Sequence, residues 1–225
     1  MKKIFSWLAI VLVAFLMFPS GVNNMQSNPD APGTIQLPEP ARSGVVSLEE
    51  ALAQRRSVRE FLPDALTTRQ LSQLLWAAQG ITASGGYRTA PSAGALYPLE
   101  IYVAIPIGFY HHIPARHRLT LVSATDMRQP LYRAALEQEA IRDAGAVFVI
   151  AAVYERTAQK YGATRGERYV HIEAGHAAQN LLLEAGALGL GAVPMGAFRD
   201  ADVQKVLSLP RNHQPLYLIP VGKPR

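Results

Sequence analysis

In Arg88-Thr-Ala-Pro-Ser-Ala-Gly-Ala-Leu-Tyr-Pro-Leu-Glu-Ile-Tyr-Val103, a loop of small residues runs directly into an alternating apolar segment. Two prolines and Gly94 shape the backbone of this loop, and residues 92–95 carry almost no side chain. Main-chain N–H and C=O groups can therefore come close to a flat ligand. The alternation that continues over residues 99–105 is typical of a strand, so the sequence predicts a ligand-contacting loop at the start of a strand.

The other segments mix helices and strands without a strict β-α-β repeat. Ser47 and Thr67 each begin a capping-box pattern, in which Glu or Gln follows three positions later. Ala146–Val153 is a continuous apolar run and predicts a central strand. The further predictions are helices over residues 48–56, 67–80, 126–141 (capped by Asp126) and 169–188, and strands over residues 119–122 and 216–221. The packing positions expected in the last helix are Ile172, Ala178, Leu181, Leu182 and Ala185. Together they predict an α+β fold.

Composition places the chain among ordinary globular proteins. It has 225 residues, of which 49% are hydrophobic and 17% are charged, and this length suits one domain with a sizeable core. The absence of cysteine from the sequence excludes disulfides, thiolate metal sites and a cysteine nucleophile. The formal charge of +5 comes from scattered basic residues and not from a dense stripe, so we do not expect nucleic-acid binding.

The N-terminus is typical of an export signal. Lys2 and Lys3 precede a nearly apolar run of 15 residues, Ile4–Phe18, which is shorter than the roughly 20 residues of a spanning helix. We interpret residues 1–22 as a signal peptide or a retained anchor, with the rest exported to the periplasm or another extracytoplasmic space. Residues 23–43 hold four prolines and are interpreted as a tether. Residues 44–225 then form the domain, which would meet a membrane only through an uncleaved N-terminal segment.

Two separated groups of cations are candidates for binding a phosphate. Arg55, Ser57 and Arg59 follow the first predicted helix, and two guanidinium forks with a hydroxyl suit a phosphate dianion. Arg55 and Arg59 would share a face if that helix persisted. The alternative is that these cations complement the dipole at a helix C-terminus. Lys223 and Arg225 form the second group, for which the alternative is a solvated tail.

Two further segments could contact a reacting group. Gly189 and Gly191 follow a helix and do not join a strand to a helix, so they do not match the dinucleotide-binding fingerprint. The turn over residues 194–197 can instead present backbone N–H groups to the edge of a ligand. Lys160 and Tyr161 are expected in a polar loop before the long helix, where they are able to donate or accept protons. The alternative is a surface loop with exposed cations.

The histidines do not match a known metal motif. His171, Glu173 and His176 are candidates for zinc ligands, but the two histidines are five residues apart, so they do not share a helix face as the H-E-x-x-H zinc motif requires. We expect His176 to be packed and hydrogen-bonded, and we expect His111 and His112 to be exposed in a polar turn. The sequence also lacks a G-x-S-x-G elbow, so a serine-hydrolase mechanism has no visible nucleophile.

These segments, in this order, resemble the nitroreductase superfamily, and more closely its SagB/ThcOx branch of flavin-dependent dehydrogenases. The resemblance spans residues 47–225. It rests on residues 55–61, 88–103, 154–156, 160–162, 168–169, 173–180 and 187–198. The Ala-Pro-Ser-Ala-Gly-Ala-Leu-Tyr-Pro string is specific to this branch, whereas general nitroreductases more often carry Asn where Ala95 stands.

The resemblance implies an α+β sandwich with a central, mainly antiparallel sheet flanked by helices. It also implies a homodimer with two FMN molecules at its interface. By match to the family motifs, Arg55, Ser57 and Arg59 would hold the FMN phosphate, with Lys223 and Arg225 closing on it.

The same resemblance assigns the residues around the flavin ring. Pro91, Ser92 and Ala93 would reach the ring from the partner subunit, and Gly196 and Ala197 would lie near flavin N5. The ring would therefore be shared between two copies of the chain.

The function implied is that of an FMN-dependent oxidoreductase, a SagB-type dehydrogenase that passes a hydride between flavin N5 and a small-molecule or peptide-borne substrate. Lys160 and Tyr161 match a pair that abstracts a proton in azoline-oxidising members. Two alternatives are open: an NAD(P)H-driven nitro- or quinone reductase, and a flavin-binding protein without catalytic activity. Export would separate this chain from cytoplasmic azoline oxidases and from the cellular pool of NAD(P)H.

Overall fold

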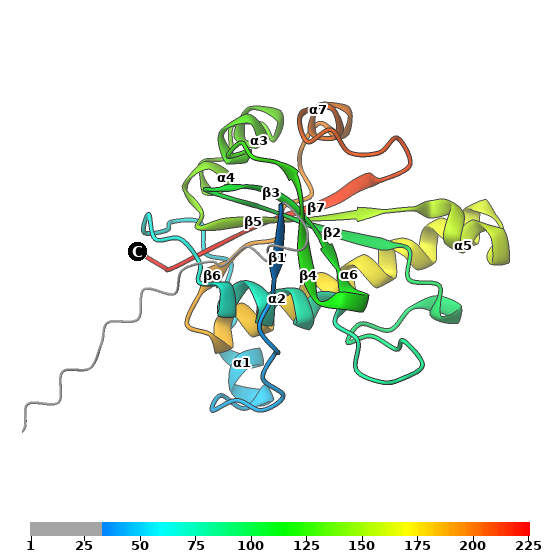
Figure 1. Ribbon diagram of the computed structural model, residues 1–225, viewed down its shortest axis with the longest axis horizontal. Helices are drawn as coiled ribbons and strands as arrows, with labels where there is room; N and C mark the ends of the chain where they lie inside the picture. Colours follow the sequence, from blue (N-terminus) through cyan, green and yellow to red (C-terminus); the bar gives the residue numbers. More distant parts are fainter. Residues whose placement is uncertain (1–32) are drawn as a thin grey trace, which may run out of the picture.

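The computed structural model of the protein describes residues 33–225. Within that range the strands form one seven-stranded sheet in the order β1-β4-β3-β2-β5-β7-β6, and the paired strands are antiparallel (Figure 1). The strands are β1 (Thr34–Gln36), β2 (Leu99–Ile105), β3 (Gly108–Ile113), β4 (Arg118–Ser123), β5 (Ala146–Ala152), β6 (Gly191–Ala192) and β7 (Gln214–Gly222). The helices are α1 (Leu48–Gln54), α2 (Thr68–Gln79), α3 (Arg128–Ala134), α4 (Glu139–Asp143), α5 (Tyr154–Tyr161), α6 (Ala163–Ala187) and α7 (Asp200–Val206). The predicted α+β fold with an antiparallel sheet is confirmed.

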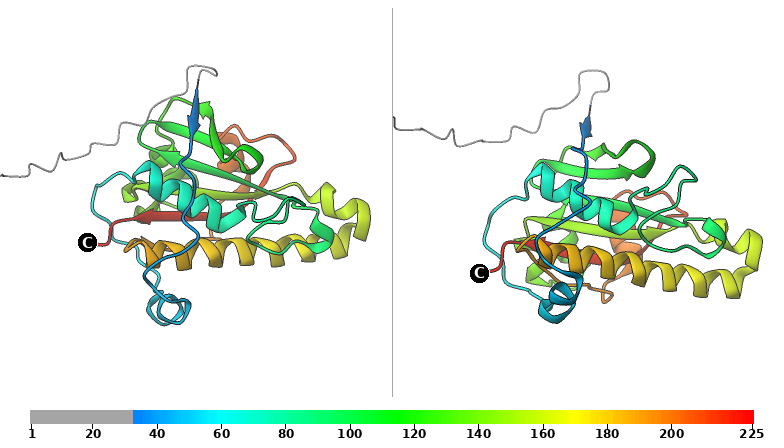
Figure 2. Two further views of the ribbon diagram at one scale, coloured as in Figure 1. Left: turned by 60° about the horizontal axis from the view of Figure 1, so that its bottom comes forward. Right: turned by 90° about the horizontal axis from the view of Figure 1, so that it is seen from below.

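The strand β5 lies in the interior of the sheet, and its side chains are all apolar and all buried. It pairs with β2 on one side and with β7 on the other. Phe148 and Ile150 enter the core beneath α2 and α6, whereas Val147 and Val149 enter the core beneath α3, α4 and α7. Figure 2 shows the long helix α6 lying along one face of the sheet. The uninterrupted apolar run follows because both faces of β5 are covered.

The strand β3 corrects the expectation of an exposed turn around the two histidines. His112 is buried, and His111 Nε2 lies 2.7 Å from Glu100 Oε2. Phe109 and Tyr110 are also buried and alternate between the two cores. Pairing with β2 and β4 satisfies the backbone here. Tertiary pairing therefore overrides the polar character that favoured a turn.

Both predicted helix starts are confirmed. The Ser47 hydroxyl accepts a hydrogen bond from Glu50 N (3.1 Å), and Thr67 and Gln70 form a complete capping box. α1 ends at Gln54, slightly before the predicted boundary, and α2 ends at the predicted glycine. These signals are local, so they can be read without knowledge of the fold.

The residues around Lys160 lie on two helices and not in the expected polar loop. α5 and α6 form a hairpin around Gly162, whose φ of 76° is easily adopted only by glycine. At Gly166, an added Cβ would lie 2.9 Å from Ala158 N, so the helices approach closely there. Polar side chains cover the outside of this hairpin, and this amphipathic pattern was wrongly interpreted as irregular chain.

Two expectations for α6 are wrong. Ile172 is 49% exposed although it was placed in the core, and His176 is exposed although we expected it to be packed. Ala178, Leu181 and Leu182 are buried, so the rest of the predicted apolar face is confirmed.

The helix predicted over residues 126–141 is divided into α3 and α4. Leu136 and Glu137 have φ values of 58° and 56°, which no right-handed helix accommodates. Asp126 Oδ1 accepts a hydrogen bond from Arg128 N (3.1 Å), so Asp126 binds the first N–H of α3, although Met127 and not Asp126 occupies the N-cap position.

The described part of the predicted tether is packed on the domain. β1 pairs with β4, Ile35 and Leu37 are buried, and the Gln73 side chain binds both N and O of Ala41 (2.9 and 3.0 Å). The tether prediction is therefore wrong for this stretch, which belongs to the fold. The signal or anchor at residues 1–22 and the tether up to residue 32 lie outside the described residues. Among the helices of residues 33–225, none has the length and apolar character needed to cross a membrane.

Candidate functional site

The first group of candidate residues lies along one edge of the sheet. After α1 the chain runs beside β6, where Ser57 pairs with Ala192, and then beside residues 222–225. Leu62 N donates to Lys223 O (2.9 Å), and Arg225 N donates to Glu60 O (3.2 Å). These bonds bring together five residues that we call the cationic edge: Arg55, Ser57, Arg59, Lys223 and Arg225.

Close approach of the backbones builds the cationic edge. A Cβ added to Gly191 would lie 2.6 Å from Val58 Cγ1, and one added to Gly222 would lie 2.9 Å from the Phe61 ring. The helix does not persist through residues 55–59, because α1 ends at Gln54. Arg55 and Arg59 therefore do not share a helix face. Side chains alternate along an extended chain and Val58 points inward, so the residues on either side of it point outward.

The charge of the cationic edge is only partly compensated. Within residues 33–225, Lys223 Nζ lies 3.6 Å from Asp64 Oδ2, whereas Arg55, Arg59 and Arg225 take part in no ion pair. Arg59 lies more than one helical turn beyond the end of α1, where the helix dipole has little effect. A phosphate dianion fits this surplus of guanidinium donors.

The turn that contains Gly196 and Ala197 lies farther along the same edge. Met195 exchanges two backbone hydrogen bonds with Leu218 of β7 (2.9 and 3.0 Å). Ala192 pairs with Val221 of the same strand, about 10 Å away along it. Ala197 O accepts a hydrogen bond from Gln138 Nε2 (2.8 Å), which fixes the turn. The turn and the cationic edge therefore form one continuous surface.

The second group of candidates gathers at the start of α6. Ser92 Oγ accepts a hydrogen bond from Tyr97 N (2.9 Å), which closes the loop on itself. A Cβ added to Gly94 would lie 2.8 Å from Lys160 Nζ and 2.8 Å from Tyr161 Oη. We call Pro91, Ser92, Ala93 and Gly94, together with Lys160 and Tyr161, the loop cluster. A glycine with a φ of 63° lets the loop backbone lie directly against the two proton-carrying side chains.

Glu173 supports the loop cluster from inside the protein, and sequence reasoning gave it no role. Its side chain is 2% exposed and lies between Ser92 and Gln79, whose Nε2 donates to Glu173 Oε1 (3.5 Å). Burial raises the pKa of Glu173 from an ordinary 4.5 to about 7, against the opposing effects of the Ser92 hydrogen bond and the Arg88 charge. The buried face of α6 is the signal that could have revealed it.

The raised pKa of Glu173 makes the free energy of unfolding depend on pH. A group whose pKa is higher in the folded state stabilises the fold fully below its unfolded pKa, and this contribution is lost as pH rises through about 7. At pH 8, Glu173→Gln is therefore expected to raise the free energy of unfolding by up to about 3 kcal/mol, with little change at pH 4.5. Urea unfolding at both pH values measures this difference, and Glu139→Gln, exposed on α4, is the control. An identical pH dependence of the Glu173→Gln variant and the parent protein would contradict the expectation.

The two groups of candidates lie at opposite ends of α6 (Figures 1 and 2). Lys160 and Tyr161 directly precede this helix, and β6 directly follows it. The 25 residues of α6 span about 37 Å at 1.5 Å per residue. One ligand of nucleotide size cannot reach both ends within one chain. The structure therefore brings the predicted residues together as two separate groups, the cationic edge and the loop cluster.

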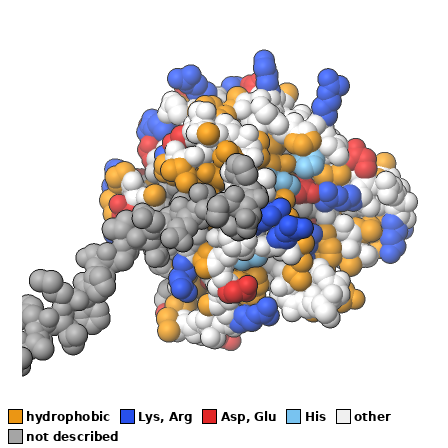
Figure 3. Space-filling view, in the orientation of Figure 1, with side chains coloured by type: hydrophobic (Ala, Val, Ile, Leu, Met, Phe, Trp, Pro, Cys, Tyr) orange, Lys and Arg blue, Asp and Glu red, His pale blue; other side chains and the backbone are white. Residues whose placement is uncertain are grey.

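A further polar network was missed by sequence reasoning. Glu100 on β2 accepts hydrogen bonds from His111 and from Arg156 of α5, and Arg156 also donates to Tyr97 O (3.0 Å). Figure 3 shows histidine, acidic and basic side chains meeting on this face of the molecule. Burial favours the neutral carboxyl group, but the two hydrogen bonds outweigh it and lower the pKa of Glu100 to about 2. A glutamate within an otherwise apolar strand was the available signal.

The structure gives no support for a metal site. Within residues 33–225, no group of three or more His, Cys, Asp or Glu side chains is placed to hold a metal ion. His171 Nε2 lies 2.7 Å from Tyr154 Oη, and both His171 and His176 are exposed, whereas Glu173 is buried. The three residues considered for zinc therefore do not converge.

Comparison with known proteins identifies the family of this chain. Residues 52–223 match the nitroreductase family. The nitroreductase-like protein MJ1384 of Methanocaldococcus jannaschii is 46% identical over 195 residues, which cover 84% of this chain and 96% of that protein. A nitroreductase-like protein of Ralstonia eutropha has a solved structure with a TM-score of 0.78 and 33% identity, covering 86% of this chain and 90% of that one. The microcin B17-processing protein McbC of Escherichia coli is 28% identical over 75% of this chain and 69% of its own length. The chain belongs to the nitroreductase family of oxidoreductases.

Proposed function

We propose that this oxidoreductase binds FMN between two copies of the chain and acts as a SagB-type dehydrogenase on a small-molecule or peptide-borne substrate. One observation carries the proposal: the cationic edge and the loop cluster lie at opposite ends of α6, so each would be one half of a site shared between two copies. A homodimer in which α6 of one copy runs antiparallel to α6 of the other would join the cationic edge of each chain to the loop cluster of its partner.

The chemistry of the cationic edge fits the FMN phosphate. Arg55 and Arg59 would donate charge-assisted hydrogen bonds, Ser57 would add a hydroxyl, and Lys223 and Arg225 would close on the same anion. FMN, when bound, supplies the hydride-transfer chemistry. The turn at Gly196 and Ala197 would lie at the edge of the ring near N5, because it continues the same surface.

The loop cluster would supply the substrate side of the site. Pro91, Ser92 and Ala93 of the second copy would cover the ring and exclude water from it. Lys160 Nζ and Tyr161 Oη lie beside this loop, where they could take a proton from the substrate or return one. Glu173 would hold the loop in place through Ser92.

Two observations support different activities within the family. The relationship to McbC, a microcin B17-processing protein, and the Ala95-containing loop support a dehydrogenase that acts on a peptide-borne group. The higher identity to a nitroreductase-like archaeal protein supports the second candidate, an NAD(P)H-driven nitro- or quinone reductase. Rapid-mixing reduction of the bound flavin by NADH and NADPH distinguishes the two, because only the second candidate accepts hydride from these donors.

We also propose that the protein works outside the cytoplasm. Lys2 and Lys3 followed by the apolar run Ile4–Phe18 support export, either with cleavage or with a retained anchor. Fractionation of the producing cells, with mass spectrometry of the mature N-terminus, tests this location.

The shared site has a direct test in mixed dimers. We expect the purified full chain to be yellow, with one FMN per chain, and to run as a dimer. The first defective variant carries both Arg55→Ala and Arg59→Ala, and the second carries Ala93→Trp. The two variants have different tags and are co-expressed. The heterodimer then contains one intact site, made from the cationic edge of the second variant and the loop cluster of the first, and is expected to bind one FMN.

A site contained within one chain predicts a different result for the heterodimer. If the whole site lay within one chain, each chain of the heterodimer would carry one defect and the heterodimer would bind no FMN tightly. Flavin content by absorbance after extraction, together with mass photometry, measures both quantities. A colourless parent protein after incubation with excess FMN would overturn the proposed function itself.

A further inference from the structure

Strands β2 and β3 separate at one end of their pairing, and a pocket of about 310 Å³ lies in the split. Their ladder stops at Tyr102 and His111, but β2 continues along β5 to Leu99 and β3 continues along β4 to Ile113. Polar side chains from both faces of the sheet line the split: Gln79, Arg88, Glu100, His111, His112 and Arg156.

Two of these side chains bury polar atoms without partners. His112 is 1% exposed, and neither of its ring nitrogens has a hydrogen-bond partner among the described residues. Arg88 donates from Nη1 to Gln79 Oε1 (2.8 Å), but its buried Nε has no partner within the same range of the chain. Buried polar groups are rarely left unsatisfied in native proteins, so we infer that both side chains form hydrogen bonds with a bound ligand.

The charges around the pocket indicate the charge of the ligand that would fit it. Arg88 takes part in no ion pair within residues 33–225. Glu173 and Glu100 favour its charge from a distance, but burial outweighs them and lowers the pKa of Arg88. Glu100 is itself bonded to His111 and Arg156. Burial lowers the pKa of His112 to about 3, so its ring is neutral at physiological pH and offers one N–H donor. One guanidinium without an ion-pair partner and one neutral donor suit a monoanion with two acceptor oxygens.

We propose that the split between β2 and β3 binds a small aliphatic carboxylate. The Nε side of the Arg88 guanidinium would donate to the carboxylate, and one ring N–H of His112 would complete its coordination. Leu99, Ile101 and Ile113 form apolar walls that would cover the hydrocarbon part. A phosphate dianion is disfavoured, because a single guanidinium and a neutral imidazole leave half of its charge unpaired.

The pocket lies directly behind the loop that precedes β2. The Arg88 guanidinium packs on the Tyr97 ring at 4.5 Å from its centroid, and Arg88 N donates to Tyr97 Oη (3.2 Å). None of the lining residues belongs to the cationic edge or to the loop cluster. Binding of a carboxylate can therefore be tested on the full chain without flavin, and its failure would leave the proposed FMN site untouched.

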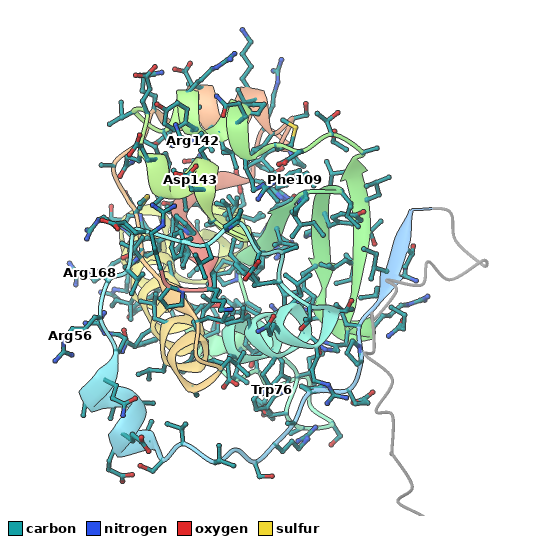
Figure 4. The ribbon with its side chains drawn as sticks, turned by 90° about the vertical axis from the view of Figure 1, so that its left-hand side faces the viewer. Arg56, Trp76, Phe109, Arg142, Asp143 and Arg168 are labelled. Carbon is teal, nitrogen blue, oxygen red and sulfur yellow. The ribbon has the colours of Figure 1, made fainter. Side chains whose placement is uncertain are left out.

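The test uses butyrate, neutral butyramide and inorganic phosphate at fixed ionic strength. Isothermal titration of the full chain is expected to show saturable binding of butyrate, at least tenfold tighter than that of butyramide or phosphate. Arg88→Gln and His112→Leu are each expected to weaken butyrate binding by at least tenfold. The control is Arg142→Gln, because Arg142 is paired with Asp143 on the outside of the molecule (Figure 4) and should leave binding unchanged.

Several results would overturn the proposal. Absence of saturable butyrate binding, equal affinity for butyramide, or tighter binding of phosphate would each do so. Circular dichroism checks that each variant is folded. If Arg88→Gln does not fold, His112→Leu decides, because leucine replaces the buried ring without leaving a polar atom unsatisfied. Unchanged butyrate affinity in a folded His112→Leu protein would reject the carboxylate site.

Discussion

The double change Arg55→Ala with Arg59→Ala is expected to weaken FMN binding by about 100- to 1,000-fold. Each charge-assisted hydrogen bond contributes about 1.5–3 kcal/mol, and every 1.4 kcal/mol is about tenfold in affinity. We take the lower end of the combined range because Arg59 is exposed, and solvent screens its interactions. Quenching of FMN fluorescence in a titration measures the dissociation constant. Raising the salt concentration should weaken binding to the parent protein more than binding to the variant.

The chain offers a matched control between the two residues. Arg56 projects away from the domain (Figure 4), and its Nη1 donates to Ala53 O (3.0 Å) and Arg55 O (2.8 Å). Arg56→Ala removes one positive charge from the same segment, where the double variant removes two, and should change FMN affinity by less than about threefold. Equal losses in Arg56→Ala and the double variant would show that only general charge matters. An unchanged affinity in the double variant would refute the phosphate assignment.

Replacing Lys160 by alanine is expected to lower turnover by about 100-fold or more while FMN remains bound. General acid or base catalysis contributes at least about this much to rate. Lys160 Nζ lies beside the loop at Gly94, at the far end of α6 from the cationic edge of the same chain. The variant should therefore keep its phosphate contacts. The measurement combines flavin content with kcat on a substrate found by screening donors and acceptors.

The matched control for this change is Lys205→Ala, in the last turn of α7. Tyr161→Phe separates the roles of the pair, since it removes the hydroxyl and keeps the ring packed against Tyr169 at a centroid distance of 4.9 Å. Full turnover by Lys160→Ala, with flavin retained, would remove Lys160 from the mechanism. Loss of flavin together with turnover would instead assign it to cofactor binding.

Helices with local capping residues, and a strand that is buried on both faces, could be predicted from the sequence. The capping residues Ser47 and Thr67 act within one helical turn, and β5 is apolar throughout because both of its faces are covered. β3 was missed because its histidines are polar, and only pairing with strands elsewhere in the sequence explains their burial. The same holds for β1, a short edge strand within a proline-rich stretch.

In the candidate site, too, some residues could be predicted from the sequence and others could not. The sequence indicated the cations, the small-residue loop and the Lys160–Tyr161 pair by their chemistry, and the structure gathers them into the cationic edge and the loop cluster. Glu173, Arg88 and His112 were not assigned a role because their significance depends on burial and on missing partners. These properties come from the three-dimensional packing and leave no spacing pattern in the sequence.

The continuous helix α6 has a consequence for any dimer built as proposed. Its first turn would belong to one cofactor and its last turn to the other, with 25 rigid residues between them. A small axial shift of this helix on filling one site would reposition groups at the other. Such coupling is reciprocal by thermodynamic necessity. Occupancy of the two sites would then be cooperative, and a half-loaded dimer would be a distinct species with its own affinity.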